Sequence, residues 1–264
     1  MTSRAAVVAC AMWLASVPVL AQAPPDFSGV YRPINAFAPP PGGRDGGPPP
    51  GARAGGPPAP GQPLPPPART APLSDGSRGR APTAPKLTPE YMAKWQAISK
   101  ARVAGSSDSD NTLKCLPPGM PAMMNMAYGM EVMQTRDKIT FFSELNDALR
   151  RVYLDGRKPT QKHLDDTTYA GYSTGHWEGD TLVVETVALH PDSFIEGFSP
   201  HSDQMVVRER IRLVGPGLLE DRITVTDPKA LTKPWETVRT YRKASKGNDE
   251  LREFACAEGL TREK

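Results

Sequence analysis

One carboxylate of the 264-residue chain falls among apolar residues on a single face of a predicted strand. Alternate residues of the segment 205–214 point to opposite faces, and Glu209 shares its face with Met205, Val207 and Ile211. A carboxylate among apolar neighbours is costly unless a positive charge or hydrogen-bond donors compensate it. We therefore expect Glu209 to point into the protein and to meet a partner there.

Other predicted strands carry charged and aromatic residues on faces that are otherwise apolar, and we expect these side chains to share the interior with Glu209. On one strand both faces are partly apolar, and Glu185 is assigned to the side of Val183 and Val187. The full set of expected inward residues is Arg151, Tyr153, Glu185, Arg239 and Tyr241. Such a set has two interpretations. It forms the polar end of a ligand pocket, or it is a structural salt-bridge network that fixes strand register.

His201 lies in a loop, Ser199-Pro-His-Ser-Asp203, just ahead of the strand that carries Glu209. A histidine at the mouth of a barrel can carry a proton in acid–base chemistry, with Glu209 or Glu185 as its partner. The alternative is a loop histidine that bonds to its own backbone.

Composition and spacing argue against several other kinds of site. The four histidines show no HxH, HxxxH or HExxH spacing, so no metal site is expected. No glycine-rich phosphate loop, serine-nucleophile elbow or CxxC motif is present, and no cofactor is expected. The net charge of +3 is interspersed, without the basic stripe that nucleic-acid binding requires. A methionine-rich stretch from Met120 to Met133 suits adaptable packing or an apolar pocket lining.

The first 23 residues resemble a secretory signal peptide. Arg4 precedes an uncharged apolar run, and Ala21-Gln22-Ala23 fits a cleavage site, which predicts a periplasmic or secreted bacterial protein without a membrane span after processing. Cleavage removes Cys10 and leaves Cys115 and Cys256. In an oxidising compartment we expect these two to form a disulfide, with two buried free thiols as the alternative.

The rest of the chain divides by composition. Residues 24–35 contain a first strand, 36–86 a disordered spacer rich in proline and glycine, 87–105 a helix, and 106–264 a β domain. Turn residues separate the segments of this β domain that read as strands. We predict strands near 131–135, 138–143, 149–154, 170–177, 181–189, 205–214, 218–226, 236–242 and 250–255. Short loops between so many strands predict a mainly all-β fold, an antiparallel barrel or half-barrel, with a β-sandwich as the alternative.

An ordered series of motifs resembles a widespread family of bacterial signal-peptide proteins of unassigned function. The motifs are Phe27-Ser-Gly-Val-Tyr31, Cys115-Leu-Pro-Pro-Gly-Met-Pro121, Arg150-Arg-Val-Tyr-Leu-Asp-Gly-Arg157, Gly171–Thr186, Pro200-His-Ser202, Val207-Arg-Glu-Arg210, Thr224-Val-Thr-Asp-Pro-Lys-Ala230 and Lys233-Pro-Trp235. The chain departs from the family pattern in its spacer, in Tyr31 in place of Trp, and in His176 in place of Lys. The start at Phe27 is also similar to lipocalin-like barrels, a likeness of fold only.

Three functions are consistent with these observations. The first is a barrel that binds a small, partly apolar ligand, with Arg151, Glu209 and Arg239 at its polar end. The second is a cofactor-independent isomerase, lyase or hydrolase that uses the same pocket with His201 and Glu209. The third is a structural envelope protein with a filled barrel.

Overall fold

The computed structural model describes residues 23–34, 84–125 and 128–254. The predicted signal peptide up to Gln22, most of the predicted spacer and Cys256 lie outside these residues. Cys115 is among them, but its expected partner is not, so the disulfide stays a prediction.

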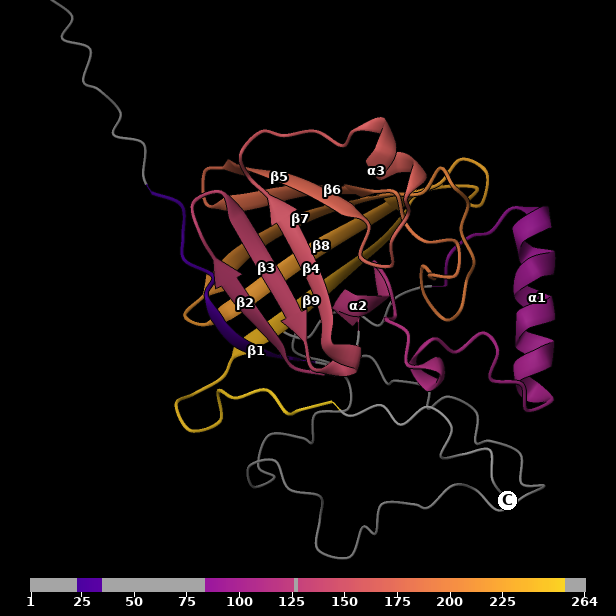
Figure 1. Cartoon of the computed structure of the whole chain (residues 1–264), viewed down its shortest axis with the longest axis horizontal. Coiled ribbons are helices and arrows are strands. Elements are labelled where there is room, and N and C mark those ends of the chain that lie inside the picture. Colours follow the sequence, from indigo (N-terminus) through magenta and orange to yellow (C-terminus); the bar gives the residue numbers. More distant parts are fainter. Residues whose placement is uncertain (1–22, 35–83, 126–127, 255–264) are drawn as a thin grey trace, which may run out of the picture.

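Nine strands close into a barrel in which each strand pairs with its neighbours in the sequence and β1 also pairs with β9 (Figure 1). The strands are β1 (Gly29–Pro33), β2 (Met130–Gln134), β3 (Lys138–Ser143), β4 (Ala148–Tyr153), β5 (Tyr172–Glu178), β6 (Thr181–Val187), β7 (Val206–Gly215), β8 (Leu218–Thr226) and β9 (Trp235–Lys243). The helices are α1 (Pro89–Val103), α2 (Ala122–Asn125) and α3 (Gln161–Asp165), with short 3₁₀ helices at Thr112–Lys114 and Leu145–Asp147. The predicted barrel is confirmed, and the alternative β-sandwich is wrong.

Two details of the predicted sheet are wrong. The barrel is not wholly antiparallel, because β4 and β5 run parallel and pair only at Val152–Ser173 and Tyr153–Thr174. The connection between them, which contains α3, is long enough for the crossover that a parallel pair needs. The last predicted strand is also missing, since residues 250–254 form no strand and the rest of that segment lies outside the described residues.

Alternation along the strands separates a buried interior from an exposed surface. On β7 the side chains of Val207, Glu209 and Ile211 are fully buried, whereas Arg208 and Arg210 are exposed. Most of the interior consists of aliphatic, aromatic and methionine side chains contributed by all nine strands. This burial of apolar area is the main force that holds the barrel closed.

Helix α1 stands beside the barrel, beyond the connection between β6 and β7 (Figure 1). Its Tyr91 is buried, and the indole Nε1 of Trp95 donates a hydrogen bond to the carbonyl oxygen of Gly197 at 3.1 Å. The guanidinium of Arg102 lies 3.5 Å from the ring centre of Phe198. The helix is therefore docked through its aromatic face, as predicted. Among the described residues, no helix has the length and apolar character needed to cross a bilayer.

Candidate functional site

A fully buried ion pair crosses the interior of the barrel between β4 and β7. Arg150 on β4 donates hydrogen bonds from both terminal nitrogens to the carboxylate of Glu209, one of them measuring 2.8 Å from Nη1 to Oε1. Its Nε donates to Ser173 Oγ on β5 at 3.2 Å, and Nη2 also donates to Thr186 Oγ1 on β6 at 3.0 Å. All four side chains have at most 1 % of their surface exposed. We call these four residues the interior cluster.

The interior cluster connects four consecutive strands across the weakest part of the sheet. The ladder between β4 and β5 contains only two residue pairs, and Arg150 bridges it through Ser173. The bidentate contact with Glu209 neutralises the buried guanidinium, and the two hydroxyl groups accept further N–H bonds. The charges of the cluster thus compensate one another, and its hydrogen bonds link β4 to β5 where their ladder is short.

Asp221 on β8 is a second fully buried carboxyl group on the interior side of the sheet. Neither of its oxygens accepts a hydrogen bond within the described part of the chain. Burial raises its pKa well above the usual range, and the negative charge of Glu209 raises that pKa further. A protonated Asp221 carries no charge and can donate a hydrogen bond to Glu209, which is the arrangement that these surroundings favour.

The structure places three of the predicted site residues where the alternation put them. Glu209 is buried inside the barrel, and Arg239 and Tyr241 lie on the inward face of β9. The hydroxyl of Tyr241 donates to the carbonyl oxygen of Met124 at 2.5 Å, and burial raises its pKa well above the usual range. Arg239 lies 3.5 Å from Glu196 of the connection between β6 and β7. Glu209, Arg239 and Tyr241 are thus confirmed as inward residues.

Three predicted orientations are wrong, those of Arg151, Tyr153 and Glu185. Tyr153 lies on the outer face of β4 together with Arg151. Arg151 is exposed, and it is Arg150 that points inward, because the buried face of β4 is Ala148, Arg150 and Val152. The face of Arg151 was predicted to be the inner one because it also carries Leu149, but Leu149 is 37 % exposed on the outer surface. Glu185 is also on the outside, where it pairs with Arg208 at 2.7 Å.

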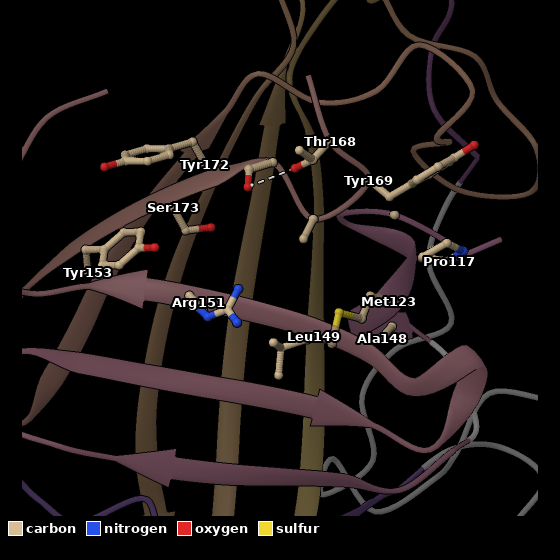
Figure 2. A pocket seen from close by; sticks show the side chains of 13 residues that line it. Pro117, Met123, Ala148, Leu149, Arg151, Tyr153, Thr168, Tyr169, Tyr172 and Ser173 are labelled. Carbon is tan, nitrogen blue, oxygen red and sulfur yellow. Dashed lines mark hydrogen bonds between the residues drawn. The ribbon is translucent and has the colours of Figure 1, made fainter. Parts of the chain in front are cut away.

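The outer face of β4 nevertheless borders a pocket of about 410 Å³ in the wall of the barrel. It lies where β4 and the segment that leads into β5 diverge, and the segment 117–123 closes its far side (Figure 2). The residues that line it are Pro117, Gly119, Met123, Ala148, Leu149, Arg151, Tyr153, Thr168, Tyr169, Ala170, Gly171, Tyr172 and Ser173. We call this cavity the wall pocket. Ser173 belongs both to its lining and to the interior cluster, so the buried ion pair lies directly behind the pocket.

Three tyrosines of the wall pocket are braced by a neighbouring ring or guanidinium. Tyr172 stacks on His163 of the crossover with ring centres 4.2 Å apart, and Tyr169 stacks on His190 at 4.4 Å. The guanidinium of Arg157 lies 4.2 Å from the ring centre of Tyr153. The crossover and the connection after β6 thereby hold the aromatic walls of the pocket in place.

His201 is buried, and its ring nitrogens make contacts within residues 190–202. Nε2 lies 2.8 Å from Ser193 Oγ and 3.1 Å from the His190 carbonyl oxygen, while Nδ1 lies 2.8 Å from the Ser202 carbonyl oxygen. Burial lowers the pKa of His201, although its backbone contacts oppose that effect. Within the described residues neither ring nitrogen bonds to Glu209 or Glu185, so the expected proton-carrying pair is not assembled.

The sequence interpretation missed Arg150, Asp221 and two of the three tyrosines of the wall pocket, Tyr169 and Tyr172. For Asp221 the signal was present, because Leu219, Ile223 and Val225 share its face by alternation. For the pocket it was not, because Tyr169 lies in the connection before β5 and Tyr172 at the start of β5, and the path of both depends on the unexpected parallel pairing.

No group of three or more His, Cys, Asp and Glu side chains in the described residues is arranged to hold a metal ion. Comparison of the sequence with protein-family models and with curated proteins gave no match. The barrel and its wall pocket therefore carry the functional argument.

Proposed function

We propose that this barrel binds a small, partly apolar molecule in its wall pocket. The observation that carries the proposal is the pocket itself, whose volume of about 410 Å³ falls within the range of small-molecule sites. Its lining is mainly apolar and aromatic, with a few polar groups that can fix orientation, as such sites require. Arg151 and Tyr153, expected from the sequence as ligand contacts, both belong to it.

We propose further that the protein is exported and belongs to the signal-peptide family that its motifs resemble. Support comes from the basic, apolar and small-residue order of the first 23 residues. Mass spectrometry of the protein from a periplasmic fraction measures its N-terminus, and a chain that still begins at Met1 would contradict export with cleavage after Ala23.

A thermal-shift screen of the mature protein against a metabolite library tests the binding function. A ligand that binds only the folded state raises the melting temperature. Ala170→Trp, which places a large ring in the wall pocket, should abolish the shift. Ala101→Trp, at an exposed position of α1, is the matched control and should retain it. The proposal fails if library hits bind Ala170→Trp as well as they bind the wild type.

A further inference from the structure

The charge of the wall pocket is more informative than its shape. Among the described residues that line it, Arg151 is the only charged one, and none of them is acidic. In the barrel interior behind the pocket, the carboxylate of Glu209 compensates the charge of the Arg150 guanidinium. Burial raises the pKa of Asp221, which favours its neutral form. The pocket therefore faces one uncompensated positive charge.

Within the described residues, Arg151 is exposed and has neither an ion pair nor a hydrogen bond, a property that it shares among the strand arginines with Arg242 on β9. Its counterparts on the outer faces of β7 and β8 all have carboxylate partners. These pairs are Arg208 with Glu185 at 2.7 Å, Arg210 with Glu178 at 2.9 Å, Arg212 with Glu220 at 3.3 Å and Arg222 with Glu220 at 2.9 Å. Of these two arginines without a partner in the described part of the chain, Arg151 is the one that borders the cavity.

From this arrangement, and resting on the proposed binding function, we propose that the ligand is a small carboxylic acid with a flat ring. Its carboxylate would accept two parallel hydrogen bonds from the guanidinium of Arg151, a geometry that suits a planar fork. Its ring would pack among Tyr153, Tyr169 and Tyr172, whose orientations are fixed in advance by their stacking partners. Preorganised walls of this kind reduce the ordering cost of binding.

A single positive charge favours a carboxylate over a phosphate ester. A phosphate monoester carries close to two negative charges near pH 7, and sites for it gather several cations or N–H donors. The wall pocket offers one guanidinium and is otherwise lined by tyrosines, small residues and apolar side chains. A cationic ligand is disfavoured by the same charge.

Calorimetric titration with matched probes tests the proposal. The probes are 3-phenylpropionate, its uncharged amide, 3-phenylpropylamine and phenyl phosphate. We expect the wild type to bind the carboxylate at least about ten-fold more tightly than the amide, because the ionised acceptor strengthens each hydrogen bond. Arg151→Gln should lower the affinity for the carboxylate to that for the amide and leave the affinity for the amide unchanged. Arg151→Lys should retain part of the difference, because it keeps the charge without the fork.

Arg208→Gln is the matched control, since it removes an exposed arginine outside the pocket, and it should change none of the affinities. The proposal is overturned if the amide, the amine or phenyl phosphate binds as tightly as the carboxylate, or if Arg151→Gln weakens carboxylate and amide equally. It is also overturned if none of the four probes binds. A library ligand that Ala170→Trp excludes would then leave the binding function standing, whereas the absence of any such ligand would remove both proposals.

Discussion

Arg150 and Glu209 bring two charges into the barrel, and neither charge is exposed to solvent. Removing one partner leaves the other as an uncompensated buried charge, which costs far more than the intact pair contributes. We expect Arg150→Met to lower the free energy of unfolding by about 3–5 kcal/mol. The double variant Arg150→Met with Glu209→Leu should recover most of that loss, because it removes both charges. Urea unfolding followed by circular dichroism measures both.

The exposed pair of Arg208 with Glu185 is the control for that experiment. Both side chains are about half exposed, so Glu185→Gln should change the stability by at most about 1 kcal/mol. If the double variant at positions 150 and 209 is no more stable than the single variant, the loss in Arg150→Met does not come from an uncompensated charge on Glu209. If Glu209→Gln keeps full stability and only ligand binding is lost, the cluster serves the site rather than the fold.

Asp221 makes stability depend on pH in a defined direction. Its pKa is raised by burial, so the folded protein retains a proton that the unfolded chain releases above a pKa of about 3.9. The free energy of unfolding must then fall as the pH rises from that value toward the folded pKa. Asp221→Asn has no proton to release, and its stability should fall less than that of the wild type between about pH 5 and pH 8.

Chemical unfolding at several pH values measures this difference, with the exposed Asp108→Asn as the control. The control should follow the wild-type dependence on pH. Parallel curves for wild type and Asp221→Asn would mean that the buried carboxyl ionises as easily in the folded protein as in the unfolded chain.

At the scale of single residues, alternation correctly predicted which side chains face inward where one face of a strand is plainly apolar. That was the case for Glu209 on β7 and for Arg239 on β9. It failed on β4, because two arginines are adjacent and the exposed Leu149 belongs to the wall pocket. A residue that borders a pocket has the composition of a core residue, and one sequence cannot separate the two.

Among the elements, the strands were predictable because turn residues interrupt clear runs of β-forming side chains. The pairing of β4 with β5 was not, because strand direction is decided by where a long connection crosses the barrel. The wall pocket lies beside this short parallel ladder, so the position of the site depends on a topological feature that local patterns do not encode.

Gly171 directly precedes β5, lines the wall pocket and has a φ of 67°. A Cβ added there would lie 2.8 Å from the carbonyl oxygen of Val187 and 2.6 Å from a methyl carbon of Thr186. We expect Gly171→Ala to destabilise the protein well beyond the ~1 kcal/mol that the left-handed conformation alone costs an alanine. Thermal unfolding of the variant measures this loss.

Gly156→Ala isolates the conformational part of that cost. Gly156 has a φ of 77°, and an added Cβ would meet nothing within 4 Å. Equal losses from the two substitutions would show that β6 can move away from Gly171, and that the start of β5 is not tightly held against it.

For the whole molecule, closure of the barrel was predictable from the number of strands and their short loops, but closure leaves no free strand edge to anchor the ends of the chain. Cys115 precedes β2, and Cys256 follows β9. A disulfide between them would enclose eight of the nine strands in one covalent loop. In chain-entropy terms a loop of this length stabilises a fold by about 5 kcal/mol, because it restricts the unfolded chain.

On the proposal that the protein is exported and its signal peptide removed, we expect the denatured, unreduced mature protein to expose no thiol, and two thiols after reduction. The double variant Cys115→Ser with Cys256→Ser should have a lower free energy of unfolding than the wild type, and reductant should lower the wild-type value toward that of the variant. Reductant should leave the variant unchanged, which separates loss of the bond from any effect of the serines themselves. Two free thiols before reduction would rule out the bond, and the nine-stranded barrel would then be stabilised without a covalent link between these two positions.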